Sequence, residues 1–212
     1  MNWHRQWAKV LGFVASAALL SWAGLAAASS PDDVVEERTM AVAAVLALPD
    51  SPERTERLAA TIDESLDFAF LAGLALGRHW EQRSDEERQE FMDLLRTLLQ
   101  NNYEDRLTGH ELDDDYTVEF ESSRVRGDRA FVPAEVDYDG RVESLVYRLY
   151  RDDDDWRIYD LIVDDISLEE TYRDGYVPII EEHGWEELIR RMQERVDQLT
   201  SDDGDTGAGS AN

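Results

Sequence analysis

The first part of the chain carries apolar residues at helical spacing. Apolar positions recur every three or four residues over 34–48, again from Pro52 into the run FLAGLALG, and once more beyond Ser84. This spacing predicts three helices. Gly77 is placed to end the second helix, and Ser84 with Glu87 forms a capping-box pattern that begins the third, which leaves RHWEQR as a connection.

From residue 116 the apolar period changes to two, which is the spacing of a β-strand. Four strand-like segments follow, at 116–125, 130–139, 141–150 and 156–163. Short, turn-prone links separate them, and Asp139-Gly140 is a strong hairpin signal. Short links between consecutive strands predict an antiparallel meander, and Pro133 predicts an edge or a bulge in the second strand.

The third and fourth of these segments are apolar on both faces. In the third segment, one face carries Leu145, Tyr147 and Leu149 and the other carries Val142, Val146 and Tyr150. In the fourth, one face carries Trp156, Ile158 and Ile162 and the other carries Tyr159, Leu161 and Val163. Such a sheet needs an apolar partner on each face, because exposed apolar area is costly in water. Helices supply one partner. The second face either lines a hollow interior or is covered by further helices, and both alternatives stay open.

The last part of the chain returns to helical spacing. Ser167 and Glu170 form a second capping-box pattern, a break is expected near Gly184, and an amphipathic helix is predicted over 185–199. The small, polar residues 200–212 predict a disordered tail. Helices, a four-stranded antiparallel meander and further helices define the class as α+β.

The N-terminal residues have the three parts of a secretory signal peptide. Arg5 and Lys9 precede an apolar core, and Ala26 and Ala28 have the spacing that a signal peptidase recognises. Residues 1–28 are therefore expected to be removed, so that the mature domain covers 29–199. The chain has no cysteine, which excludes disulfides and attachment of lipid to a cysteine.

Charge is strongly unbalanced, with 48 acidic against 21 basic residues. Two of the basic residues lie in the predicted signal, so the mature chain has a formal charge of −29. This excess excludes long-range attraction to nucleic acid or to anionic membranes. Its spread over the whole length is typical of a surface adapted to high salt. A metal-binding polyacid is the alternative, but the Asp clusters lack the pattern of a calcium loop.

Convergent catalytic groups are difficult to find in this sequence. His79, His110 and His183 lie in three separate connecting regions, and none has a zinc-binding spacing with another ligand. No serine lies in a nucleophile-elbow pattern, and no glycine-rich loop is suited to cradle phosphate. These observations disfavour hydrolases of the common serine type, zinc enzymes and nucleotide-binding enzymes.

One enzyme class stays open because its fold matches the predicted elements. A cone-shaped α+β domain can hold a carboxylate deep in its cavity and act on a hydrophobic small molecule. Asp160 is the candidate general base, since simple alternation places it on one strand face with Trp156 and Ile158, and Tyr147 or Tyr159 is the candidate hydrogen-bond donor. The alternative role for Asp160 is to pair with an arginine or to cap a turn.

Three sequence blocks occur in order along the chain: LGRHW, WRIYD and SLEETYR. Together they resemble the MlaC family of periplasmic phospholipid-binding proteins, and the resemblance extends over residues 67–199. The chain departs from the family pattern at Asp165, where glycine is usual, at Thr171, where asparagine is usual, and at Tyr176, where phenylalanine is usual.

The resemblance implies a nuclear transport factor 2-like cone, in which a four-stranded antiparallel meander is wrapped by N- and C-terminal helices. It implies a periplasmic carrier without enzymatic activity or cofactor, whose cargo is phospholipid with the acyl chains enclosed. The implied partners are an inner-membrane ABC transporter complex with a periplasmic lipid-binding ring and an outer-membrane lipoprotein-porin complex. The implied role is maintenance of outer-membrane lipid asymmetry.

Carriage of lipid through water requires nearly complete enclosure of its acyl chains. Exposure costs about 0.8 kcal/mol per CH₂, hence roughly 12 kcal/mol for a chain of about 16 carbons. Apolarity and shape suffice for this task, and an adaptor with a filled interior is the remaining alternative. The candidate lining residues are Leu71, Leu74, Phe91, Leu95, Leu98, Val146, Tyr147, Leu149, Ile158, Leu161 and Val163. The sequence leaves open which sheet face meets lipid. Candidates for phosphate contact at the rim are Arg78, Arg148 and Arg173.

Overall fold

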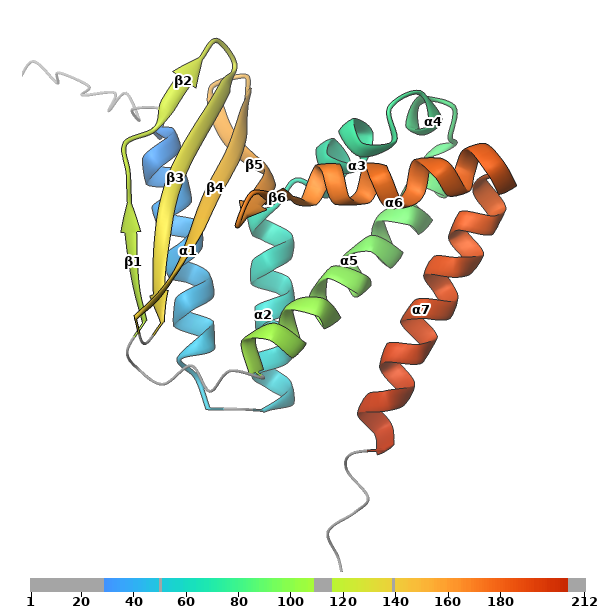
Figure 1. Ribbon diagram of the computed structural model, residues 1–212, viewed down its shortest axis with the longest axis horizontal. Helices are drawn as coiled ribbons and strands as arrows, with labels where there is room; N and C mark the ends of the chain where they lie inside the picture. Colours follow the sequence, from blue (N-terminus) through green and yellow to red (C-terminus); the bar gives the residue numbers. More distant parts are fainter. Residues whose placement is uncertain (1–28, 50, 109–115, 139, 206–212) are drawn as a thin grey trace, which may run out of the picture.

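The computed structural model describes residues 29–49, 51–108, 116–138 and 140–205. Figure 1 shows an antiparallel sheet at one side of the molecule and a group of helices at the other. The predicted signal at 1–28, His110 and the last residues of the predicted tail, 206–212, lie outside the described residues. The α+β class and the antiparallel meander predicted from the sequence are confirmed.

Seven helices are present in the part of the chain that the structure describes. They are α1 (Pro31–Leu46), α2 (Pro52–Ser65), α3 (Phe68–Leu76), α4 (Arg78–Glu81), α5 (Asp85–Thr108), α6 (Leu168–His183) and α7 (Trp185–Asp205). The six strands are β1 (Tyr116–Phe120), β2 (Arg124–Arg126), β3 (Arg129–Tyr138), β4 (Arg141–Asp152), β5 (Asp155–Val163) and β6 (Ile166–Ser167).

The first two helices differ from the prediction at their ends. α1 begins three residues early because Ser30 and Asp33 form a capping box, in which the Ser30 hydroxyl accepts from the Asp33 amide at 3.1 Å. The predicted second helix is not continuous. Leu66 is extended, and the Asp67 side chain accepts from the Phe70 amide at 2.9 Å and so starts α3 as a separate helix.

The stretch after α3 agrees with the prediction of a helix end and a restart. Gly77 has a φ of +52° and ends α3, although the predicted connection contains the short helix α4. Ser84 and Glu87 make both bonds of the predicted capping box at the start of α5. The Trp80 ring lies 6.0 Å from that of Phe91, so the indole anchors this connection to the helices.

The sheet has the strand order β1-β3-β4-β5-β6, and β2 also pairs with β3. The first predicted strand is therefore two short strands that pair with the two halves of β3. The prediction of an edge at Pro133 is wrong, because β3 is paired on both sides. Pro133 lies opposite the interruption between β1 and β2, where its carbonyl accepts from the Glu121 amide at 2.9 Å.

A β-bulge in β5 changes which residues share a face. Arg148 pairs with Asp160, whereas the next residue, Leu149, pairs with Ile158, so Tyr159 is the extra residue. The simple alternation predicted for this strand is therefore wrong beyond Ile158. Asp160 lies on the face of Arg148, opposite to that of Ile158.

The same shift moves the apolar residues at the end of β5. Leu161 pairs with Tyr147, and Val163 pairs with Leu145, so both lie on the face that carries Leu149 and Ile158. Helix α1 covers part of this face and contacts β3 and β5 (Figure 1). The opposite face meets α3 and the beginning of α6.

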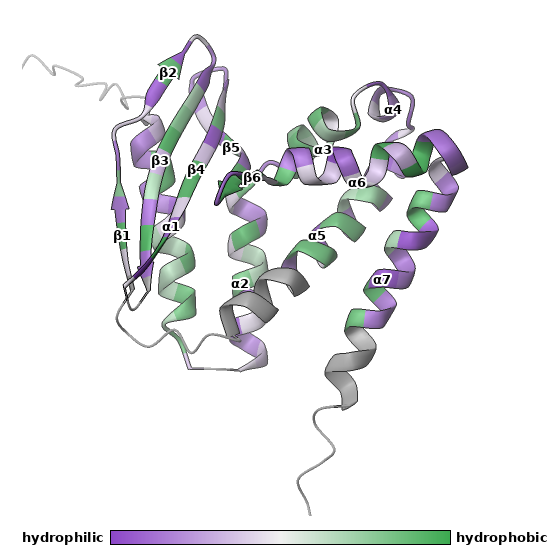
Figure 2. Ribbon diagram, in the orientation of Figure 1, coloured by the Kyte–Doolittle hydropathy of each residue, from purple (hydrophilic) through white to green (hydrophobic). Residues whose placement is uncertain are grey.

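The larger core is formed by helices. It consists of the buried residues Phe68, Ala72, Leu76, Phe91, Leu94, Leu95, Leu98, Leu99, Trp185, Leu188 and Met192. These residues come from α3, α5 and α7, and α3 is apolar almost throughout (Figure 2). Ser167 caps α6 as predicted, Gly184 separates α6 from α7, and α7 continues beyond the predicted end to Asp205. The cluster of buried residues from α3, α5 and α7 is called the helical core below.

A second, smaller core lies between α1 and the sheet. It consists of Val35, Ala130, Val132, Leu149, Trp156 and Ile158. Leu66, in the break between α2 and α3, packs against both cores. The two cores are thus joined at one side chain that the sequence had placed in the middle of a helix.

Candidate functional site

The α1-facing side of the sheet is only partly covered. Its apolar residues at the β3 side are fully buried, but those toward β6 are not. We call the less buried part the open patch, and it consists of Leu145, Tyr147, Leu161, Val163 and Ile166. The first four side chains are half-buried, and Ile166 is 66% exposed. The open patch continues the small core without a polar interruption, because Leu149 and Ile158 lie next to it on the same face.

Helix α1 is bound to the open patch by one polar contact. The Thr39 and Tyr147 hydroxyls lie 3.0 Å apart. Burial raises the pKa of Tyr147, so its hydroxyl stays protonated and able to donate at neutral pH. Val42 and Leu46 continue the Thr39 side of α1 at helical spacing, and both are half-buried. The helix therefore extends an apolar stripe along the same side of the sheet.

The predicted lining residues fall into three groups. Tyr147, Leu149, Ile158, Leu161 and Val163 lie together on the α1-facing side. Phe91, Leu95 and Leu98 belong to the helical core. The others are not brought together: Leu71 is fully buried in α3, Leu74 is 36% exposed on the same helix, and Val146 lies on the opposite sheet face.

Asp160 anchors the start of α6 to the sheet. Its carboxylate is completely buried and accepts from Arg148 Nη1 at 3.0 Å, from the Ser167 hydroxyl at 2.8 Å and from the Glu169 amide at 3.0 Å. Glu169 is also buried and lies 3.5 Å from Arg148 Nη1. Three donors occupy the two oxygens of this carboxylate, which is a structural arrangement rather than that of a free general base.

The candidate hydrogen-bond donors do not converge on Asp160. Tyr147 lies on the other face of the sheet, where it contacts α1. The Tyr159 ring packs 5.2 Å from that of Phe70 and 6.2 Å from that of Tyr150. The catalytic pair that the enzyme hypothesis requires is therefore not formed. The bulge places Tyr147 and Asp160 on different faces, and Tyr159 packs among aromatic rings while Arg148, Ser167 and Glu169 occupy the Asp160 carboxylate.

The three arginines considered for phosphate contact all have acidic partners. Arg78 pairs with Glu181 at 2.7 Å, and Arg173 pairs with Glu169. Arg148 is held by Asp160 and Glu169. These guanidinium groups pair with residues of α6 or of the sheet in this structure, and the strand register places Arg148 on the face opposite to the open patch.

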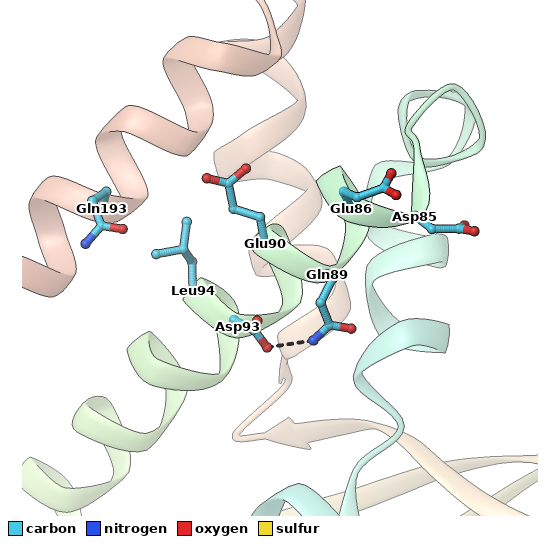
Figure 3. A pocket seen from close by; sticks show the side chains of 7 residues that line it. All are labelled: Asp85, Glu86, Gln89, Glu90, Asp93, Leu94 and Gln193. Atoms are coloured by element: carbon cyan, nitrogen blue, oxygen red, sulfur yellow. Dashed lines mark hydrogen bonds between the residues drawn. The ribbon is translucent and has the colours of Figure 1, made fainter.

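A separate hollow of about 670 Å³ lies between α5 and α7 (Figure 3). Its lining residues are Asp85, Glu86, Gln89, Glu90, Asp93, Leu94 and Gln193. Gln89 donates to Asp93 at 2.8 Å, and the wall carries four carboxylates with a single leucine. Such a surface disfavours an acyl chain, so it is not the apolar cavity expected from the sequence.

Among the described residues, no group of three His, Asp or Glu side chains is arranged to hold a metal ion. His79 lies 3.8 Å from Glu181, and His183 lies 3.7 Å from Glu182. No described helix has the combined length and apolarity needed to cross a bilayer.

Sequence reasoning missed two residues that position the site. Asp67 bonds three elements together, because its amide donates to the Ile158 carbonyl at 2.8 Å and its carboxylate accepts from the Tyr150 hydroxyl at 2.6 Å. The pattern Asp67-Phe68 before an apolar run is a capping signal that could have revealed the helix break. Ile166 was missed because the turn at Asp164 and Asp165, which pairs it with Val163, was not predicted from the sequence.

The fold and the open patch define an α+β protein with one antiparallel sheet face that is apolar and incompletely covered. The model of the MlaC protein family matches residues 37–194, well over half of the sequence, and this chain belongs to that family. The family resemblance seen in the three sequence blocks is thereby confirmed.

Known proteins that are similar to this chain include the following two. The first is the intermembrane phospholipid transport system binding protein MlaC of Haemophilus influenzae, which is 24% identical over 139 residues, 63% of this chain and 64% of that protein. The chain thus aligns with slightly less than two thirds of this curated relative. The second is the structure of a phospholipid-binding protein from Ralstonia solanacearum in complex with a phospholipid. It has a TM-score of 0.73 and 25% identity, and the match covers 81% of this chain and 99% of that one.

Proposed function

We propose that this protein is a periplasmic phospholipid carrier that encloses acyl chains against the α1-facing side of its sheet. The observation that carries the proposal is the open patch, which is apolar, half-buried and continuous with a closed core. The names of both relatives, which refer to phospholipid transport and to a bound phospholipid, support this choice of cargo.

Physical chemistry supports the same proposal. The half-buried side chains of the open patch leave apolar area in water, and each CH₂ of a bound chain that covers them gains roughly 0.8 kcal/mol. The outer surface has the opposite character, because the chain carries 48 acidic residues. Such a surface keeps a lipid-loaded carrier soluble and away from anionic membranes during transit.

The lining that we propose is narrower than the one predicted from the sequence. Tyr147, Leu161 and Val163 form its first layer, because they are apolar and incompletely covered. Leu149 and Ile158 form its floor. The candidates on α5 are closely packed within the helical core and join the lining only if the helices of that core separate from one another.

The partners belong to the proposal as well. A carrier between two membranes must collect phospholipid at one and deliver it at the other, and we propose an outer-membrane lipoprotein-porin complex and an inner-membrane ABC transporter complex for these roles. Binding that buries whole acyl chains makes spontaneous release slow. Contact with a partner must therefore favour a more open state of the carrier.

Native mass spectrometry tests the proposal directly. Protein isolated from the periplasm without detergent is expected to carry an added mass equal to that of a phospholipid, which organic extraction removes. A bare polypeptide mass in every preparation would contradict carriage and favour an adaptor with a filled interior.

A matched pair of substitutions tests the proposed face. Leu161 and Val146 are both half-buried, but the strand register places them on opposite faces. Leu161→Asp is expected to lower the lipid-bound fraction about tenfold or more, since a charge then faces the acyl chain, and Val146→Asp is expected to leave most of it. Equal losses in two variants of equal stability would count against the α1-facing side.

A further inference from the structure

We propose that Ile166, on the edge strand β6, forms the entry through which an acyl chain passes onto the open patch. This inference rests on the proposed function and adds to it the direction of approach. Ile166 is the most exposed residue of the open patch, and it lies at the margin of the sheet rather than beneath a helix.

A single row of residues leads from the buried interior to this margin. Ala134 pairs with Leu145, Leu145 pairs with Val163, and Val163 pairs with Ile166, so all four lie on one face. Burial falls along this row: Ala134 is 2% exposed, the next two residues are half-buried, and Ile166 is 66% exposed. The row is apolar throughout.

The shape of this row fits an unbranched chain. Three steps between neighbouring strands span roughly 14 Å, and the adjacent row of Val132, Tyr147 and Leu161 runs parallel to it. Together the two rows form an apolar strip, which is bordered on one side by the buried row of Ala130, Leu149 and Ile158. An acyl chain can slide along such a strip and keep its CH₂ groups in apolar contact at each stage.

The entry is held in a fixed position by hydrogen bonds on both sides of Ile166. Before it, the Asp164 amide donates to the Ser144 carbonyl at 3.1 Å, and the Ser144 amide donates to the Asp164 carboxylate at 3.3 Å. After it, the Ser167 hydroxyl donates to the buried Asp160. Asp164 and Asp165 both have positive φ and form the turn before Ile166. Ile166 therefore follows a polar turn and precedes the polar Ser167.

The polar neighbours limit the apolar opening to one residue. Asp164 and Asp165 are exposed on one side of Ile166, and Ser167 is buried on the other. Ile166 is not part of the small core between α1 and the sheet, so its exposure to water is not explained by packing in that core. A role in passage of the cargo explains both its apolar character and its exposure.

The experiment measures loading and release of lipid separately. Full-length protein and its Ile166→Asp variant are loaded with a fluorescent phosphatidylcholine, and its release into excess phosphatidylcholine vesicles is followed; loading is followed from labelled vesicles. Both rates are expected to fall on the order of tenfold in the variant, because a carboxylate then meets the passing chain. The amount bound at equilibrium is expected to change less than twofold, against the tenfold loss expected for Leu161→Asp, because Ile166 lies outside the proposed lining of the bound chain and an entry acts on both directions equally.

Two further variants complete the test. Val142→Asp is the matched control, because Val142 is 58% exposed on the other face of β4, and it is expected to keep wild-type rates. Ile166→Leu is expected to keep them as well. Wild-type rates in Ile166→Asp, an equal slowing in Val142→Asp, or faster release alone would overturn the entry. If the wild-type protein retains no labelled lipid, the proposed function itself fails.

Discussion

The helical core and the open patch are built from the same kinds of residues, but they bury them to different extents. Leu95 and Leu188 of the helical core are 1% and 0% exposed, whereas Leu161 and Val163 of the open patch are half-buried. Burial of apolar area is the main source of stability. The helices therefore contribute most of the stability of the fold, while the sheet keeps an apolar area that is incompletely covered.

The strongest test of this comparison uses one substitution in each region. Leu95→Ala is expected to lower the free energy of unfolding by about 3 kcal/mol, because it opens a cavity in a closed core. Leu161→Ala is expected to cost about 1 kcal/mol, since the side chain is already partly in water. Urea unfolding of the lipid-free proteins measures both. Similar costs at the two positions would show that the open patch is as closed as the helical core.

The buried carboxylate of Asp160 predicts an effect of nearly the same size. Asp160→Asn is expected to cost roughly 3 kcal/mol, because Arg148 then loses one of its two buried carboxylate partners and the bonds from Ser167 and Glu169 lose a charged acceptor. Arg78→Gln removes a pair with Glu181 in which both side chains are exposed, and it is expected to cost about 0.5 kcal/mol or less. Thermal and urea unfolding compare the two variants, and a small effect at Asp160 would contradict its role as the anchor of α6.

The contact between α1 and the open patch predicts a smaller effect. Tyr147→Phe and Thr39→Val are each expected to cost about 1 kcal/mol, since each removes one side of the same hydrogen bond. The double variant is expected to cost little more than either single variant. Hydrogen exchange of α1 measures the loosening, which should leave the helical core protected. Additive effects in the double variant would mean that the two hydroxyls do not interact.

The smallest expected effect is a pH dependence within α7. Hydrogen bonds from Arg190 and Arg191 lower the pKa of Glu187 to about 2 from its ordinary value of 4.5. A depressed carboxyl pKa contributes stability above pH 4.5 that is lost as the pH falls toward 2. Glu187→Gln should therefore differ from the wild type at pH 6 and converge with it near pH 2. Urea unfolding at several pH values measures this difference in the free energy of unfolding. A difference that stays constant between pH 6 and pH 2 would contradict the pairing.

Periodicity predicted the helices and strands, because it depends only on which face is buried. The predicted helix over α2 and α3 failed at Leu66 and Asp67, since the bond from Asp67 to the Ile158 carbonyl joins residues far apart in the sequence. The prediction of one continuous first strand failed for a similar reason. The chain forms two short strands there, β1 and β2, because each pairs with a different half of β3. Local patterns carry no information about such partners.

Part of the open patch could be predicted from the sequence, but its arrangement could not. Tyr147, Leu161 and Val163 were identified as lining candidates, but the sequence left open which sheet face they share. The β-bulge decides this, and nothing in the residues WRIYD marks Tyr159 as the extra one. The role of Asp160 also depended on the bulge, because only the shifted register brings it to Arg148.

The bulge at Tyr159 has a consequence for exchange of segments between relatives. The extra residue shifts the alternation of side chains along β5 by one position. The α1-facing side therefore carries Ile158 before the bulge and Leu161 after it. Removal of a single residue there would turn Leu161 and Val163 away from α1. A chimera that takes β5 from another family member therefore has to keep the residue count between Trp156 and Ser167, even where it changes every side chain.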